Sequence, residues 1–443
     1  MQRANKRAIW GWYAFDWAAQ PYHTLLVTFI FAPYFASAVV SDPVEGQALW
    51  GFMMGAVGIC VLVLAPIFGA VADSSGPRKP WILFFVAMTA VGASALWWAE
   101  PGADAVWPIL VAFALGLVSV ELAQTFINAV LPTLGPRRDL GVIGGNAWAL
   151  GYAGGVASLI VMLLLFAEGA GGKTLLGNAP ALGLDPEARE GTRLVGPLTA
   201  AWLLAFALPY LIFTPDVERF ARTTGAVRRG MRELFQTIRY LPETPSFFAY
   251  LGSSMFYRDA LGGLYAFGGI YAVGVLEWEV TQVGIFGIIA AAAGALACWV
   301  GGYADRAFGP KRVIFWCILV LIAVCVTVVG MSRESFFGMP LAPGSALPDQ
   351  VFFVCGAVIG AMGGVLQSAS RTLLVDQANP DRVTEAFGLY ALAGRATSFL
   401  APTLIALATT LTDSQRLGVS PVIGLFVLGL VILYFVKSRK EYA

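Results

Sequence analysis

Charged residues are scarce in this sequence. Only 12% of its 443 residues are Asp, Glu, Lys or Arg, whereas a soluble domain usually carries about 25%. Hydrophobic residues make up 58% of the chain, so too few charges remain to cover the surface of a soluble protein of this size. The composition therefore predicts an integral membrane protein whose surroundings are the lipid bilayer.

Histidine and cysteine are also few, which narrows the function classes. The single histidine, His23, excludes a histidine-rich metal site. The five cysteines lie in apolar segments without CxxC spacing, which is typical of small packing residues rather than disulfides. A net charge of +1 offers no basic surface for nucleic acid. We expect no cofactor, no metal and no nucleic-acid partner. Without a phosphate loop or a nucleophile elbow, nothing in the sequence supports an enzyme.

Apolar runs recur along the chain at lengths that suit a membrane-spanning helix, which needs about 20 residues. The basic residues near the beginning precede such a run without a small-residue cleavage site, so we expect a retained first helix rather than a signal peptide. We predict an all-α membrane protein with twelve spans, near residues 9–38, 48–72, 81–99, 106–131, 140–166, 196–213, 246–273, 280–303, 312–331, 350–372, 383–409 and 419–436.

Lysine and arginine are distributed unevenly between the two sides of these spans. With this threading, 20 of the 28 lie on the side of both termini, and five lie on the opposite side. Positively charged loops tend to remain in the cytoplasm, so both termini are expected there. We therefore expect a multi-pass protein of the plasma membrane, which in a bacterium is the inner membrane.

The twelve spans fall into two groups of six. We expect an N-terminal bundle over 1–213, a cytoplasmic linker over 214–245 and a C-terminal bundle over 246–443. The linker contains the stretch RGMRELFQTIRYL, whose apolar residues recur at helical spacing. This pattern predicts an amphipathic helix that lies on the membrane surface.

The two halves carry matching residues, which indicates a duplication. A shift of 243 positions superposes Asp16 on Asp259 and Gln124 on Gln367. Two parallel repeats of six spans are typical of secondary transporters.

Two loops match as well. GAVADSSGPRKP follows the second span, and GGYADRAFGPKR follows the eighth. Both resemble the GxxxD(R/K)xGxR(R/K) signature of major facilitator superfamily transporters, in which this motif helps to close the cytoplasmic side. The resemblance implies the major facilitator fold, with two pseudo-symmetric six-helix bundles. It also implies a cytoplasmic gate formed by Gly69, Asp73, Gly76, Arg78, Asp305 and Arg306.

Longer strings resemble one branch of this superfamily. They are WYAFDWAAQPY in the first span, FINAVLPTLGP and GNAWALGYAGG across the fourth and fifth, and QSASRTLLVDQANPDRVTEAFGLYALAGR across the tenth and eleventh. They are similar to the vacuole effluxer-like branch, which contains autophagy-linked vacuolar amino-acid exporters. The resemblance implies an amino-acid-like substrate. In GYAGG, Tyr152 stands where an antiporter motif has proline, so we interpret these small residues as a site of close helix packing.

Charges inside the spans are confined to a few helices, although each costs about 2.5–3.5 kcal/mol at the centre of a membrane helix. Apart from the span ends, spans 3, 6, 9 and 12 contain none. In the fold that the resemblance implies, spans 1, 4, 7 and 10 line a central cavity and span 11 borders it. We therefore expect the buried charges to border a water-accessible path. They are Asp16, Glu121, Arg258, Asp259 and Arg395, with Arg371 near a cytoplasmic end.

Helical spacing places uncharged polar residues beside these charges, because positions three, four or seven apart share a face. Asp16, Gln20 and His23 form one such row. Asp16, Glu121 and His23 are the candidates for proton coupling. We predict a substrate site formed by Asp16, Gln20, Glu121, Gln124, Asn128, Tyr257, Arg258, Asp259, Gln367, Arg371 and Arg395.

Arg258 and Asp259 are adjacent in sequence and therefore point about 100° apart on a helix. Each needs a partner on another helix: Asp16 or Glu121 for Arg258, and Arg371 or Arg395 for Asp259. We expect one arginine to bind a substrate carboxylate and one acid to bind its ammonium group. The alternative interpretation is a set of buried ion pairs that only fix helix register, with Arg371 anchoring its helix at the lipid boundary and His23 serving as a packing residue.

These features predict a monomeric secondary transporter. It would move a small polar metabolite, such as an amino acid or similar zwitterion, by alternating access, with protons as candidate partners in symport. The alternative is a non-transporting receptor or assembly factor on a transporter scaffold, which has less need for a cavity lined with charges.

Overall fold

The computed structural model describes residues 5–75, 77–135, 140–216, 244–378 and 383–437. These residues form helices, connecting loops and one short hairpin, so the predicted helical class is confirmed. The chain divides into two compact units. Of the described residues, unit 1 contains 5–41, 59–216 and 279–284, and unit 2 contains 42–58, 244–278 and 285–437.

The division expected at 214–245 stays a prediction, because 217–243 lie outside the described residues. The amphipathic helix predicted in that stretch lies outside them too.

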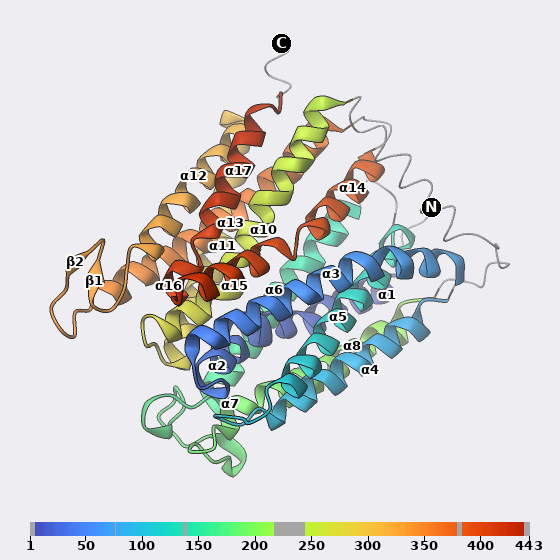
Figure 1. Cartoon of the computed structure of the whole chain (residues 1–443). Helices are drawn as coiled ribbons and strands as arrows, with labels where there is room; N and C mark the ends of the chain where they lie inside the picture. Colours follow the sequence, from blue (N-terminus) through green and yellow to red (C-terminus); the bar gives the residue numbers. More distant parts are fainter. Residues whose placement is uncertain (1–4, 76, 136–139, 217–243, 379–382, 438–443) are drawn as a thin grey trace. The chain divides into compact units, whose positions relative to one another are not determined.

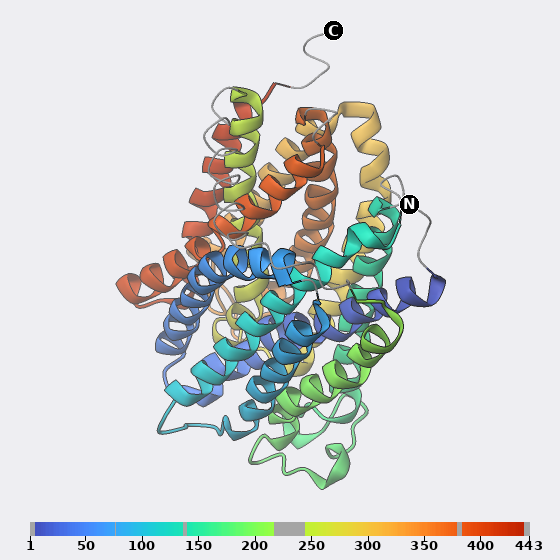
Figure 2. The same ribbon diagram turned by 90° about the vertical axis from the view of Figure 1, so that its right-hand side faces the viewer.

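Unit 1 is a bundle in which α1 packs against α6 and α8, while α4 packs against α5 and α8 (Figure 1). The connection between α6 and α8 forms a region of loops and short helices at one end of the unit (Figure 2). Its elements are α1 (Lys6–Pro21), η1 (Tyr22–Phe29), α2 (Phe31–Tyr34), η2 (Phe35–Val39), the second part of α3 (Pro43–Ser75), α4 (Lys79–Ala95), η3 (Leu96–Trp98), α5 (Trp107–Val130), η4 (Leu131–Thr133), α6 (Leu140–Leu165), η6 (Ala170–Gly172), η7 (Ala181–Gly183), α7 (Glu190–Arg193) and α8 (Val195–Phe213).

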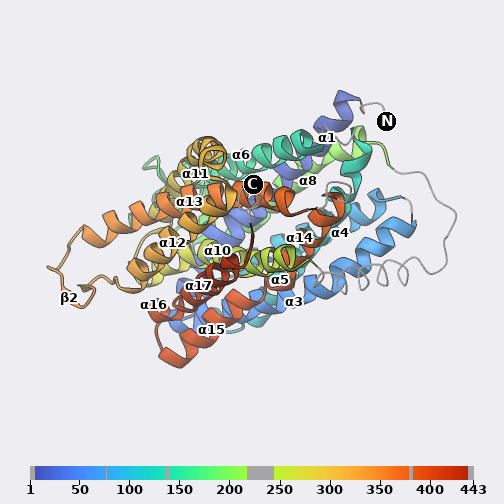
Figure 3. The same ribbon diagram turned by 90° about the horizontal axis from the view of Figure 1, so that it is seen from above.

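Unit 2 is a second helical bundle, in which α10 packs against α13, α14 and α17, and α12 packs against α13 (Figure 3). The strands β1 and β2 pair antiparallel in the loop between α12 and α13. Its elements are the first part of α3, α10 (Pro245–Gly274), α11 (Val280–Phe308, apart from its first turn), α12 (Pro310–Val329), β1 (Ser335–Phe336), β2 (Met339–Pro340), α13 (Leu347–Gln377), α14 (Val383–Ala396), α15 (Leu400–Thr412), α16 (Gln415–Gly418) and α17 (Pro421–Tyr434).

The predicted spans appear as long helices. Among the described residues, eleven helical segments are both long enough and apolar enough to cross a membrane. The predicted seventh span, α10, is not among the eleven, although its 30 residues are long enough. Its sequence includes serines, glycines and the charged pair Arg258 and Asp259.

The first predicted span, 9–38, is helical but not uniform. The α-helix α1 ends at Pro21, and the next eight residues, Tyr22–Phe29, form a π-helix. Proline has no N–H and clashes with the preceding turn of an α-helix. Such π segments are rare and occur often at functional sites.

The predicted eleventh span, 383–409, is interrupted. α14 ends at Ala396, and α15 begins only at Leu400. Two hydroxyls in the break bond to carbonyl oxygens: Thr397 Oγ1 donates to Met255 O, and Ser398 Oγ donates to Arg395 O. The break exposes the first amides of α15, which need acceptors from elsewhere.

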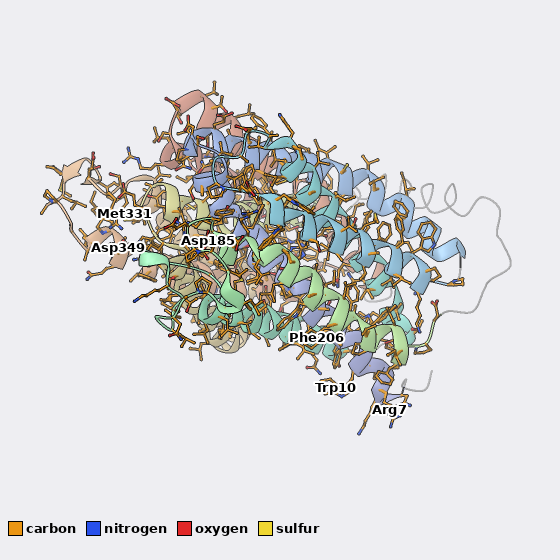
Figure 4. The ribbon with its side chains drawn as sticks, turned by 90° about the horizontal axis from the view of Figure 1, so that it is seen from below. Arg7, Trp10, Asp185, Phe206, Met331 and Asp349 are labelled. Atoms are coloured by element: carbon orange, nitrogen blue, oxygen red, sulfur yellow. The ribbon has the colours of Figure 1, made fainter. Side chains whose placement is uncertain are left out.

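Each unit has an aromatic and aliphatic core and an apolar outer surface. In unit 1, Tyr22 Oη donates to Phe113 O at 2.7 Å, and Trp12 Nε1 donates to Ile127 O at 2.9 Å. On the outer surface, Trp10 of α1 and Phe206 of α8 are 62% and 37% exposed (Figure 4). Large exposed apolar side chains of this kind suit contact with lipid.

Candidate functional site

A polar contact joins α1 to α5 inside unit 1. Gln124 Nε2 donates to Asp16 Oδ1 at 2.8 Å, and both side chains are half-buried. The two residues were predicted from their spacing on separate spans, and the structure brings them together. Asp16 also lies beside Gly151 of α6, where an added Cβ would come within 3.3 Å of the Asp16 Cβ.

A second contact joins η1, which follows α1, to α5. His23 Nε2 and Glu121 Oε1 are 3.7 Å apart, with 38% and 32% of the side chains exposed. His23 is the second residue of the π-helix η1. Neither side chain is fully buried, and the two can form an ion pair when the histidine is protonated.

The remaining predicted residues of unit 1 lie on the same helices. Gln20 is half-buried on α1 next to Gly155, and Asn128 is exposed on α5. An added Cβ at Gly154 would come within 2.7 Å of Trp17 O, so α1 and α6 touch through their backbones. This confirms the close packing that the GYAGG string predicts.

In unit 2, Arg258 has a partner that the sequence does not predict. Arg258 Nη1 donates to Tyr390 O at 2.9 Å, and its guanidinium carbon lies 4.1 Å from the centroid of the Tyr390 ring. We expected a carboxylate, Asp16 or Glu121, as the partner. None of the ion pairs among the described residues includes Arg258.

Asp259 likewise differs from expectation. Its Oδ2 accepts a hydrogen bond of 2.8 Å from the backbone amide of Ala401, and the residue is only 7% exposed. We expected Arg371 or Arg395 as its partner. The observed acceptor satisfies one of the amides that the break before α15 leaves open.

Tyr257 belongs to a buried hydroxyl cluster. Its Oη lies 2.7 Å from Ser370 Oγ, and Tyr250 Oη donates to Ser370 O at 2.5 Å. The sequence predicts Tyr257 as a site residue but not Tyr250, Ser370 or Tyr390. Ser370 and Tyr390 do lie within the long family-like string across spans ten and eleven, which is the signal that could have found them.

The other predicted residues of unit 2 lie on α13 and α14. Gln367 is half-buried and Arg371, one turn later, is exposed on α13, while Arg395 is half-buried in the last turn of α14. Their roles in substrate binding stay predictions.

The motif loops are described in part. Gly76 lies outside the described residues. The surroundings of Gly69 and the side chains of Asp73 and Arg306 are likewise not described. The backbone amides of Arg78 and Lys79, at the start of α4, donate to the Asp216 carboxylate at 2.8 and 3.1 Å.

In the second copy, Thr372 Oγ1 donates to Asp305 Oδ2 at 3.2 Å. Gly309 adopts φ = +84°, a conformation that favours glycine, and joins α11, which ends at Phe308, to α12, which begins at Pro310. Asp216 and Thr372 were not predicted, because both lie far from the motifs in sequence. The gating role of the loops stays a prediction.

Comparison with known proteins decides the family. The family described as vacuole effluxer Atg22 like matches residues 43–442, which is most of the chain. The protein belongs to this family. A relative from Bacillus subtilis (strain 168), described as an uncharacterized MFS-type transporter named YxiO, is 24% identical to this Atg22-like protein over 435 residues, covering 97% of this chain and 95% of the relative.

Solved structures show the fold of the Atg22-like protein. A D-xylose–proton symporter superposes with a TM-score of 0.69 at 13% identity, covering 97% of each chain. The nucleoside transporter NupG superposes with a TM-score of 0.68 at 12% identity, covering 97% of this chain and 100% of that one. The protein therefore has the fold of major facilitator superfamily transporters. At these identities the likeness shows the fold alone and leaves the substrate open.

Proposed function

We propose that the protein transports a small zwitterion, an amino acid or a close analogue, across the cytoplasmic membrane by alternating access. In this proposal both termini lie in the cytoplasm, and protons are the coupling ion. The observation that supports it best is that the Arg258 guanidinium contacts the ring and the backbone carbonyl of Tyr390. A guanidinium held within a membrane helix by a ring and a carbonyl keeps its full positive charge and attracts an anion.

Unit 1 contains carboxylates of its own. Asp16 and Glu121 lie on predicted spans, where Asp16 accepts a hydrogen bond from the Gln124 amide and Glu121 lies beside His23. Carboxylates of this kind suit an ammonium group or a proton. Intramembrane ionisable residues are expensive and commonly mark substrate or ion pathways.

A ligand series tests the proposal directly. Full-length protein purified in detergent is heated with an amino acid, with its amide, which lacks the carboxylate, and with its decarboxylated amine. A ligand that binds the folded state raises the melting temperature. At a ligand concentration of one hundred times Kd, the folded state gains about 2.7 kcal/mol of stability. We expect the melting temperature to rise with at least one amino acid and to stay unchanged with its amide and with its decarboxylated amine.

Arg258→Gln supplies the matched variant. It should lose the shift for the amino acid while its melting temperature without ligand changes little. A survey of the twenty amino acids without any shift, or equal shifts for acid and amide, contradicts the proposal. The non-transporting alternative predicts binding without counterflow in proteoliposomes loaded with the same ligand.

A further inference from the structure

Arg258 is held by one residue through two different contacts. Its Nη1 donates to the backbone oxygen of Tyr390, and its guanidinium carbon lies 4.1 Å over the ring of the same residue. The carbonyl fixes one edge of the planar group, and the ring fixes one face. Together they leave the guanidinium a single orientation.

These contacts hold the guanidinium without neutralising it. A guanidinium has five N–H donors. Among the described residues, the single acceptor that bonds to the Arg258 side chain is Tyr390 O. Four donors are therefore left for a ligand, and two of them on one edge match the two oxygens of a carboxylate.

The ring of Tyr390 also packs against a second aromatic ring. Its ring stacks on that of Tyr250, with centroids 6.1 Å apart and planes 4° from parallel. Tyr250 is fully buried, and its hydroxyl donates to Ser370 O. A ring clamped in this way provides a rigid surface, which α10, α13 and α14 build together.

Gly394 leaves the space that the guanidinium occupies. It lies four residues after Tyr390 on α14 and therefore on the same helix face. An added Cβ at Gly394 would come within 2.5 Å of Arg258 Nη1 and 2.6 Å of its guanidinium carbon. Any larger residue would displace the guanidinium from the Tyr390 ring.

We infer that Tyr390 and Gly394 are positioning residues that hold Arg258 ready to bind the carboxylate of the transported substrate. The inference rests on the proposed function for the identity of the ligand. The positioning itself is independent of that ligand and can be measured without it.

The experiment compares G394A with G262A in the full-length protein purified in detergent. Gly262 lies on α10 one turn after Arg258, and an added Cβ there meets nothing within 4 Å. Reaction of each arginine with phenylglyoxal is followed by mass spectrometry of the digested protein. Arg333, which pairs with Asp349 at 2.8 Å in the same unit, is the internal reference. General loosening of the fold would raise the reaction rate at both arginines.

We expect G394A to change the rate at Arg258 by about threefold or more relative to Arg333, and G262A to leave the ratio within about twofold. Y390L should behave like G394A, whereas Y390F keeps the ring and the backbone carbonyl and should behave like the wild type. If G394A and Y390L both match G262A, the inference is overturned.

Binding of the zwitterion separates this outcome from the proposed function. Where an amino acid binds, G394A should raise its Kd about tenfold and G262A should not, as expected for one displaced charge-assisted pair. If G394A changes the rate at which Arg258 reacts with phenylglyoxal, but the protein binds no amino acid, the positioning is supported and the amino-acid assignment is overturned. Amino-acid binding that is equally tight in all four variants overturns the positioning and leaves the transport proposal standing.

Discussion

The carboxylate of Asp259, on α10, accepts a hydrogen bond of 2.8 Å from the backbone amide of Ala401, the second residue of α15. A residue from one helix thereby caps the start of another. The amide would otherwise be buried without an acceptor, because α15 begins inside unit 2 after a break. Asp259 therefore has a structural contact that its spacing in the sequence does not reveal.

Replacing this cap should destabilise the protein. Asp259→Ala is expected to cost about 0.5–2 kcal/mol of stability, the range measured for lost helix caps. Asp259→Asn keeps a carbonyl oxygen in the same place and should cost less. Thermal unfolding of both variants in detergent checks this. Equal stability of all three proteins, with transport lost in both variants, would instead support the substrate role predicted from the sequence.

The pair of His23 and Glu121 predicts coupling to protons. In proteoliposomes, a pH gradient of one unit can support about a tenfold substrate gradient per proton, because about 1.4 kcal/mol is tenfold in concentration. Glu121→Gln should abolish this accumulation and leave exchange without a gradient. Gln124→Glu is not a suitable control, because it would add an acid beside Asp16. Val111→Ile, at an exposed position of α5 outside the predicted site, is the better one. Transport that ignores pH in the wild type rules out proton coupling.

Glu168, in the loop after α6, predicts a pH-dependent stability. The residue is 1% exposed, and neither carboxylate oxygen has a hydrogen-bond partner in good geometry among the described residues. Burial raises the pKa of this carboxyl above its usual 4.5, while nearby Arg189 and Thr192 oppose the rise. The folded protein therefore binds more protons than the unfolded chain between the two pKa values.

The sign follows from that difference. Stability should be greatest below the unfolded pKa and should fall as the pH rises toward the folded value. Glu168→Gln imitates the protonated acid, so its melting temperature should vary less with pH and exceed that of the wild type at neutral pH. Melting curves of both proteins between pH 4.5 and 8 provide the measurement. Parallel curves for the two proteins would contradict this role for Glu168.

A glycine of α3 predicts a tight helix contact inside unit 2. An added Cβ at Gly51 would come within 2.7 Å of Pro402 O and 2.8 Å of the Ala406 Cβ, both on α15. Gly51→Ala should therefore cost about 1–3 kcal/mol, because backbone atoms must move. Gly424→Ala, on α17 where nothing lies within 4 Å, should be neutral or stabilising. The order of the two melting temperatures is the test, and the reverse order contradicts it.

Much of the architecture could be predicted from the sequence, because lipid imposes long apolar helices and penalises isolated charges. The row Asp16, Gln20 and His23 followed from helical spacing, whereas the hydrogen bond from Gln124 to Asp16 did not. Close packing at GYAGG was predictable from its small residues, although its partner helix, α1, was not.

The partners in unit 2 could not be predicted in this way. Tyr390 meets Arg258 through its ring and its carbonyl across 132 positions, and hydropathy carries no signal for such a contact. The amide that Asp259 caps needs an acceptor because the eleventh span breaks between Ala396 and Leu400, and the hydropathy pattern predicts one continuous span there. Opposite charge predicts an arginine as the partner of Asp259, whereas the structure supplies the backbone amide of Ala401 at the start of α15.

The π-helix Tyr22–Phe29 gives the first membrane segment a means of twisting. Each of its turns closes on the fifth residue rather than the fourth, so it stores one residue of slack. Rewinding a turn as ordinary α-helix would release that residue and rotate everything beyond it by about 100°, the angular step of an α-helix. Residues beyond the rewound turn would then face different neighbours without the span tilting as a whole.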